Sequence, residues 1–184
     1  MEFIIIGLLV LLLVVWVILT YNRLARERLK VNTQWSQIDV VLKQRSDLIP
    51  NLVETVKGYA SHEQETLQAV TDARTKYVGS SDQTSMIKSS NELSGALGRL
   101  IAVAEAYPEL KANQNFLELQ KQISEIENKL ADFRQFYNDT VMRYNRQVIT
   151  IPTVILAKLF NFGEAVFFNV EESEKINPKI SFGK

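Results

Sequence analysis

The chain has 184 residues with 21 basic and 21 acidic side chains, a single histidine and no cysteine. The neutral balance argues against the basic footprint of a nucleic-acid-binding domain. The missing cysteines exclude disulfides, thiolate nucleophiles and cysteine-type zinc sites, and one histidine excludes a multi-histidine metal site. Apolar residues make up 46% of the chain and are concentrated at its start. This asymmetry predicts one hydrophobic segment attached to a water-soluble body.

The start of the chain predicts a transmembrane anchor. Residues 3–19 carry no charge, and about 20 helical residues cross a hydrocarbon core of about 30 Å. Trp16 and Tyr21 suit the interfacial layer at the C-terminal end of such a span. The alternative is a cleaved signal peptide, but the apolar stretch is long and Glu2 is its only early charge. We therefore expect residues 1–20 to stay as a single-pass anchor.

The flank of this anchor predicts its orientation. Only one acid, Glu27, lies among four basic side chains, which are Arg23, Arg26, Arg28 and Lys30. Cytoplasmic flanks of membrane spans carry an excess of lysine and arginine. We therefore expect a single-pass protein of the cell membrane with its N-terminus outside and its body in the cytoplasm.

The body carries the sequence pattern of long helices. From Leu24 to Tyr77 an apolar heptad pattern of coiled-coil type runs almost unbroken, and Arg45 is one of its few polar positions. The pattern predicts a first helix over about 22–78. Pro50 is expected to kink this helix. A second possible break lies at 58–61, where Ser61 and Gln64 could form a capping box.

Two further helices are predicted over about 85–106 and 114–148. The first carries a row of small residues at every fourth position, from Ser90 to Ala106, which would let a neighbouring helix approach closely. Asn113 is a plausible N-cap of the second. Tyr137 and Tyr144 stand seven residues apart, so we expect them in the core with their hydroxyl groups at its rim.

The last part of the chain, 151–184, changes character. Pro152 closes the third helix, an apolar stretch follows, and a polar tail runs from Glu171 to Lys184. Its phenylalanines could close the end of the bundle or contact a membrane or a partner, and they are Phe160, Phe162, Phe167 and Phe168. The fold class expected is all-α. The N-terminal transmembrane helix continues into an antiparallel bundle of long helices over 21–150, with the short C-terminal apolar segment packed on it.

Few residues point to catalysis. His62-Glu63 begins like a zinc-protease motif, but Thr66 stands where the second histidine is needed. Asp39, Asp47 and Asn51 lie near one helix face and fit a solvated stripe better than a cation site. We therefore expect no catalytic, metal or cofactor site. The rival is an enzyme that combines His62 and Glu63 with one of three carboxylates, those of Asp39, Asp47 and Glu105.

Several runs of the sequence closely resemble the LemA family. They include Trp35 to Val40 (WSQIDV), Asp47 to Ala60 (DLIPNLVETVKGYA), Glu105 to Ala112 (EAYPELKA) and Ala157 to Phe160 (AKLF). The resemblance covers nearly the whole chain and is looser after residue 152. It implies a bacterial membrane protein with one N-terminal span, an extracellular N-terminus and a cytoplasmic helical bundle. It supplies no catalytic residues.

The expected function is that of a non-enzymatic, membrane-anchored helical scaffold or adaptor. Some LemA family members are encoded beside a membrane zinc metalloprotease, so the resemblance also suggests such a partner and a role in membrane-protein quality control. Because a first helix over 22–78 would be longer than the other two, we expect apolar surface near the membrane to bind a second copy or another membrane protein. The residues expected there are Val31, Trp35, Ile38 and Leu42. The other alternative is membrane remodelling by the phenylalanines between 160 and 168.

Overall fold

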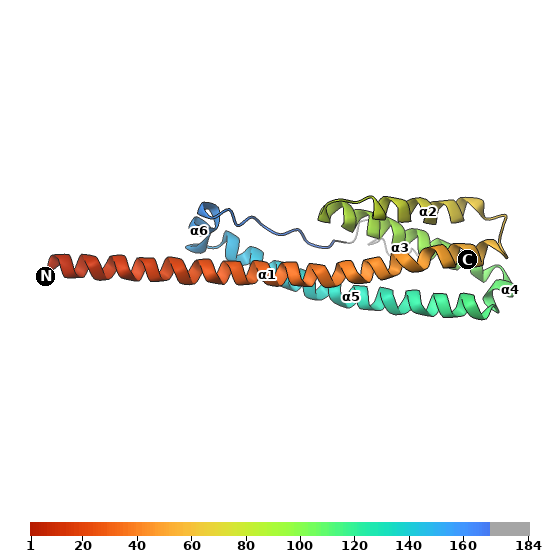
Figure 1. The fold of residues 1–184 in the computed structure, drawn as a ribbon, viewed down its shortest axis with the longest axis horizontal. Coiled ribbons are helices and arrows are strands. Elements are labelled where there is room, and N and C mark those ends of the chain that lie inside the picture. The colour runs from red at the N-terminus through yellow and green to blue at the C-terminus, as the bar shows by residue number, and fades with distance from the viewer. Residues whose placement is uncertain (170–184) are drawn as a thin grey trace, which may run out of the picture. The chain divides into compact units, whose positions relative to one another are not determined.

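The computed structural model describes residues 1–169, and its regular elements are all helices (Figure 1). In chain order they are α1 (Glu2–Lys57), α2 (Gln64–Val78), α3 (Gln83–Glu105), α4 (Pro108–Lys111), α5 (Gln114–Ile149) and α6 (Thr153–Leu159). The all-α class predicted from the sequence is confirmed for this part of the chain. The predicted polar tail, 171–184, lies outside the described residues.

The helices form two compact units. The first contains residues 1–39 and 132–167, and the second contains residues 40–131 with Phe168 and Asn169. Both α1 and α5 run through the two units: residues 2–39 of α1 and 132–149 of α5 belong to the first, and the rest of each helix belongs to the second. The two units are described separately below.

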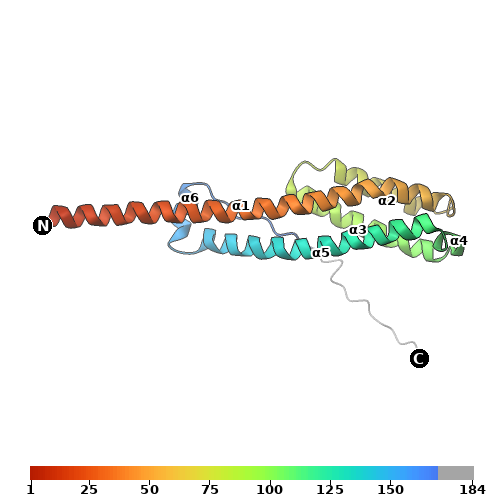
Figure 2. The ribbon, with the colours of Figure 1, turned by 60° about the horizontal axis from the view of Figure 1, so that its bottom comes forward.

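In the first unit, the early part of α1 and the late part of α5 lie side by side (Figures 1 and 2). Their heptad positions meet in a narrow core, because each helix presents one apolar stripe to the other. α6 and the residues after it close this core with Leu156, Ala157 and Phe162. The buried apolar side chains of the two long helices in this unit are Leu24, Val31, Ile38, Tyr137, Val141, Tyr144 and Val148.

The second unit is a bundle built by the later part of α1, α2, α3 and the early part of α5. α2 packs against α3. Apolar positions three and four residues apart supply the core, as the sequence predicts. Its fully buried large side chains include Leu42, Ile49, Leu52, Leu93, Leu100 and Ile123.

The helix predicted over 22–78 is divided in the structure. α1 ends at Lys57, a turn follows, and α2 begins at Gln64. The turn lets the stripe of α2, which contains Leu67 and Val70, face α3. The predicted Ser61–Gln64 capping box is wrong, because Glu63 is the N-cap and no side-chain hydrogen bond caps this helix.

The ends of α3 and α5 agree with the helices predicted over 85–106 and 114–148 to within two residues, whereas α4 and α6 were not predicted. The N-cap predicted at Asn113 is confirmed, because its Oδ1 accepts a hydrogen bond of 3.0 Å from the Phe116 N–H. At the start of α3 the Asp82 carboxylate accepts from the Ser85 N–H at 3.0 Å, which forms a capping box. This hydrogen bond lowers the pKa of Asp82.

Pro50 lies inside α1 without ending it, and it creates an attachment point for α2. Proline has no N–H, so the carbonyl of Ser46, four residues earlier, has no donor within the helix. Arg74 of α2 supplies one, since its Nε donates to the Ser46 carbonyl at 3.0 Å. The backbone hydrogen bond that Pro50 cannot make is thereby replaced by a contact between two helices of the second unit.

This arrangement predicts coupling between Pro50 and Arg74. Arg74→Ala should lower the free energy of unfolding by about 1 kcal/mol, the usual contribution of one hydrogen bond. In a Pro50→Ala background the restored N–H competes for the Ser46 carbonyl, so the same substitution should cost about half as much or less. Urea unfolding of the four proteins in detergent measures the coupling. Equal costs in both backgrounds would contradict this account.

Candidate functional site

Among residues 1–169 the structure contains one helix long and apolar enough to cross a membrane, and it is α1. Only 6% of its apolar window is buried, so this segment has almost no partner within the described chain. An exposed apolar surface of this size marks a site of contact with a membrane or with another protein. The exposed side chains of residues 3–15 therefore fit a bilayer.

A small aromatic cluster lies where the candidate span of α1 ends. The Tyr21 ring packs edge-on against Phe160 and Phe162, with centroid distances of 5.0 and 5.6 Å. Arg28, two turns further along α1, places its guanidinium 5.9 Å from the Phe162 ring centroid. The segment after α6 is thus fixed against the residues of α1 that follow its candidate membrane span.

The apolar surface predicted for a partner is not free. Val31 and Ile38 are buried in the first unit and Leu42 in the second, and Trp35 is half-buried with its ring 5.7 Å from that of Tyr137. The expectation that this stripe stays exposed is wrong. α1 is shorter than the predicted helix, and α5 covers its stripe in the first unit (Figure 2).

The opposite face of α1 is open instead. Leu29 is 65% exposed in the first unit. Two shallow grooves that share Arg26 and Leu29 border it, one reaching Leu19 and the other reaching Gln34. The polar residues around them include Asn22, Lys30 and Thr33. We call residues 19–34 on this side the outer face of α1.

The basic residues predicted to flank the membrane are all exposed, and they are Arg23, Arg26, Arg28 and Lys30. Lys30 forms an ion pair with Glu27 at 2.7 Å, and the Arg26 Nε donates to the Asn22 carbonyl. Glu27 balances the charge of Lys30 only. The three arginines therefore give this flank a net positive charge.

The four C-terminal phenylalanines do not form one exposed cluster. Phe160 and Phe167 are exposed, whereas Phe162 is buried in the first unit and Phe168 in the second. Only the first two are accessible to a membrane or a partner. A membrane or partner contact stays a prediction for Phe160 and Phe167, whereas Phe162 and Phe168 serve the cores of their units.

Tyr137 and Tyr144 are core residues with bonded hydroxyl groups, as predicted, and they hold the segment after α6. Their hydroxyls donate to the carbonyls of Val166 and Gly163 at 2.7 and 2.8 Å. Burial raises the pKa of the Tyr144 phenol, which keeps it protonated as a donor.

Asn145, which is buried beside them, binds the backbone of Ala165 twice. Its Nδ2 donates to the Ala165 carbonyl at 2.9 Å, and its Oδ1 accepts from the Ala165 N–H at 2.8 Å. We call Tyr137, Tyr144 and Asn145 the backbone clasp. It fixes an extended segment without using the side chains of that segment.

A buried arginine organises the second unit. Arg45 is fully buried, and its Nη1 donates to Glu127 and Ser94 at 2.7 Å each. Its Nη2 donates to the hydroxyl and the carbonyl of Ser90 at 2.8 and 3.1 Å. One guanidinium thus connects α1, α3 and α5. The sequence analysis interpreted Ser90 and Ser94 only as small residues that allow close helix packing. It did not predict that they accept hydrogen bonds from Arg45.

The residues of the rival catalytic hypothesis are not gathered into a site. His62 is exposed in the turn before α2, and Glu105 is exposed at the end of α3. Glu63 accepts a hydrogen bond from the Tyr107 hydroxyl at 3.0 Å, which raises the pKa of Tyr107. Asp47 and Asn51 are exposed on α1. Within residues 1–169 no group of three or more metal-binding side chains is placed to hold an ion.

Comparison with known proteins identifies the family. The model of the LemA family matches residues 34–182. Protein LemA of Metamycoplasma hominis is 26% identical over 157 residues, which cover 85% of this chain and 72% of that protein. Magnetosome protein MamQ 2 of Paramagnetospirillum magneticum is 25% identical over 177 residues, covering 82% of this chain and 65% of that protein. Magnetosome protein MamQ of Magnetospirillum gryphiswaldense is 21% identical over 178 residues, which cover 83% of this chain and 65% of that protein. The chain belongs to the LemA family.

Proposed function

We propose that this protein is a non-enzymatic, membrane-anchored adaptor that binds other membrane proteins, including further copies of itself. The observation that carries the proposal is the continuity of α1, which runs from Glu2 to Lys57 without a break. A helix shared between a span and a folded body couples the two mechanically. Contacts made in or near the membrane are thereby transmitted to the body.

The basic flank supports an orientation with the N-terminus outside and the body in the cytoplasm. Arg23, Arg26 and Arg28 are exposed directly after the span. No acid other than Glu27 lies among them, and Glu27 is paired with Lys30. A cytoplasmic location of this flank follows the usual distribution of positive charge around membrane spans, and a bacterial inner membrane is the location we propose.

The outer face of α1 is the surface that we propose for partners. It begins at Leu19, continues past the membrane through Ala25 and Leu29, and is lined by shallow grooves. A second helix that leaves the membrane beside α1 would meet this face first. Small and apolar residues such as Ala25 and Leu29 let such a helix approach, and Arg26 and Lys30 would favour an acidic partner.

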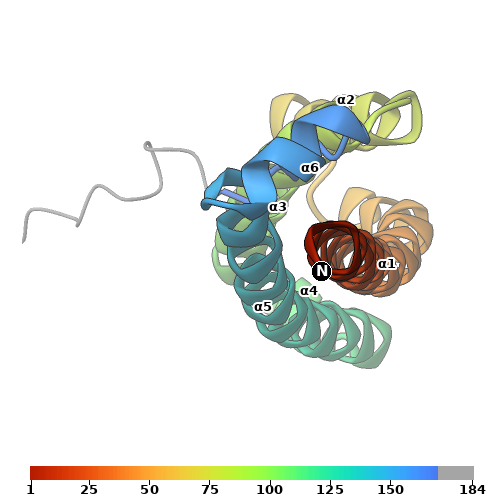
Figure 3. The same ribbon diagram turned by 90° about the vertical axis from the view of Figure 1, so that its left-hand side faces the viewer.

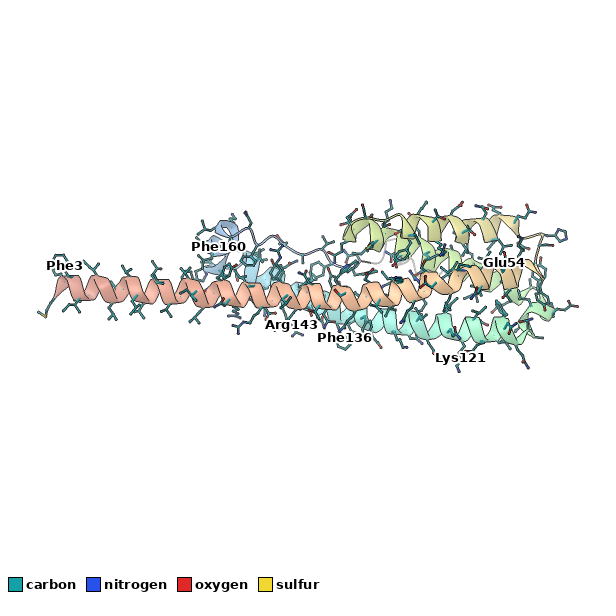
Figure 4. The ribbon with its side chains drawn as sticks, in the orientation of Figure 1. Phe3, Glu54, Lys121, Phe136, Arg143 and Phe160 are labelled. Atoms are coloured by element: carbon teal, nitrogen blue, oxygen red, sulfur yellow. The ribbon has the colours of Figure 1, made fainter. Side chains whose placement is uncertain are left out.

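Photo-cross-linking tests this proposal. A benzoylphenylalanine at Leu29 of the full-length chain, illuminated in native membranes, should give a covalent adduct with a membrane protein. The same group at Lys121, an exposed position of α5 labelled in Figure 4, should not. An adduct of twice the chain mass identifies a second copy. Mass spectrometry identifies any other partner, and a membrane zinc metalloprotease is one to look for. The absence of adducts at Leu29, or equal adducts at both positions, would contradict the proposal.

A further inference from the structure

The short helix α6 buries one side and exposes the other. Leu156 and Ala157 are buried in the first unit. Large apolar side chains on and around the other side have exposed fractions of 85, 65, 70 and 43%, and they belong to Ile151, Ile155, Leu159 and Phe160. We call these four residues the α6 patch. A soluble surface rarely gathers so many large apolar side chains within ten residues.

The α6 patch lies at the level where the membrane span ends. Phe160 belongs to the patch, and its ring contacts that of Tyr21 at a centroid distance of 5.0 Å. Tyr21 lies two residues after Leu19, the last residue of the uncharged apolar run of α1. Figures 1 and 4 show α6 and Phe160 beside this part of α1. Tyrosine at the end of a span marks the layer of lipid headgroups.

The direction of α6 suits this layer. Figure 3 views the first part of α1 end-on, and in that view α6 is seen from its side. α6 therefore runs across α1 and, where α1 crosses a bilayer, approximately along the membrane surface. Amphipathic helices that bind membranes lie in this direction with their apolar face turned toward the acyl chains.

The charges and the backbone of this region are also compatible with lipid. The basic side chains around α6 are Arg143, Arg146 and Lys158, and the nearest acidic ones along the chain are Asp139 and Glu164. Basic residues near a membrane surface are attracted by anionic phospholipid headgroups.

The N–H groups of Val154, Phe160 and Phe162 already donate to carbonyls of the same segment. These groups lose little when water is replaced by lipid.

We propose that the α6 patch is a second membrane contact, inserted in the headgroup and upper acyl region of the leaflet from which α1 emerges. The occupant of this apolar surface is phospholipid, because the patch is continuous through Tyr21 with the span. The inference requires only that α1 spans a membrane, and it stands apart from the adaptor function.

Spin labels test the proposal in the full-length chain. The sequence has no cysteine, so single substitutions Ile155→Cys and Leu159→Cys give one labelled position each. Leu12→Cys serves as a reference within the span. Phe136→Cys is the matched control, because Phe136 is apolar and exposed on α5 beside Tyr137, whose ring contacts Trp35. Trp35 lies about 14 residues, or about 21 Å, beyond Tyr21 along α1.

The labelled chains are reconstituted into vesicles of phosphatidylcholine and phosphatidylglycerol. Collision rates are then measured with oxygen, which is enriched among acyl chains, and with a water-soluble nickel chelate. For side chains about 5–10 Å below the headgroup boundary, the oxygen-to-nickel ratio at 155 and 159 should exceed that at 136 by about threefold or more. It should approach the ratio at position 12.

Two results would overturn the proposal. Ratios at 155 and 159 equal to that at 136 would place the α6 patch in water. Exclusion of both reagents, with spin–spin broadening that disappears when unlabelled chain is added, would mean that a second copy covers the patch. Neither result depends on the outcome of cross-linking at Leu29, so the two proposals fail separately.

Discussion

Replacement of Arg45 by alanine is expected to lower the free energy of unfolding by about 3 kcal/mol, since removing one partner of a buried ion pair costs about 3 to 5 kcal/mol. The lower end applies because the side chain of Glu127 is 33% exposed and can regain water once Arg45 is lost. Ser90 and Ser94 would lose their donor as well. Urea unfolding of the detergent-solubilised chain, followed by circular dichroism, measures this loss.

Three other substitutions separate the contributions to the Arg45 cluster. Arg45→Lys keeps the charge but not the planar group that reaches three partners, so it should recover less than half of the loss. Glu127→Gln should cost about 1 kcal/mol, because its amide oxygen still accepts a hydrogen bond. Arg99→Ala, on the exposed side of α3, should stay within about 0.5 kcal/mol of the wild type. An Arg45→Ala protein as stable as the Arg99→Ala protein would contradict the organising role of Arg45.

The sequence predicts the candidate span, the fold class and the ends of α3 and α5, because these depend on local pattern. An uncharged apolar run can be recognised without knowledge of the fold. A helix cap such as Asn113 forms its hydrogen bond only three residues away in the sequence. The sequence marked the division of this helix only as a possible break at 58–61, because the heptad pattern continues through the turn at 58–63. Ala60, inside that turn, is buried like a helical core residue. Periodicity therefore could not separate one long helix from two that share a core.

The candidate site was less predictable, because it depends on which segments meet. Arg45 was visible as a charge at an apolar heptad position, but Glu127 and Ser90 become its partners only through the fold. Ile38 was expected to be exposed because the first predicted helix was longer than the other two. That helix was predicted too long, and Ile38 is buried. Residues 160–168 have no regular apolar spacing, so nothing in the sequence separates the buried Phe162 from the exposed Phe160.

The backbone clasp gives the second large effect, through the substitution Asn145→Asp. The carboxylate keeps the acceptor for the Ala165 N–H but faces the Ala165 carbonyl, where the amide now donates at 2.9 Å. A buried charge against an acceptor should cost about 2 to 3 kcal/mol at pH 7. Asn145→Ala, which loses both hydrogen bonds without adding charge, should cost about 1 to 2 kcal/mol. Hydrogen exchange at the Ala165 amide reports whether the segment has detached.

The cost of Asn145→Asp should also depend on pH, which separates the charge from the loss of packing. Burial raises the pKa of the introduced carboxyl in the folded state above its unfolded value of about 3.9. Below that unfolded value the protonated carboxyl donates to the Ala165 carbonyl as the amide does, and the variant regains stability. The gain is lost as the pH rises through the folded pKa. Unfolding measured against the wild type from pH 4 to pH 8 should therefore show a growing deficit for Asn145→Asp and a constant one for Asn145→Ala. If both variants lose the same unfolding free energy at every pH, the carboxyl group of Asn145→Asp must be in solvent. The segment around Ala165 would then detach from the backbone clasp.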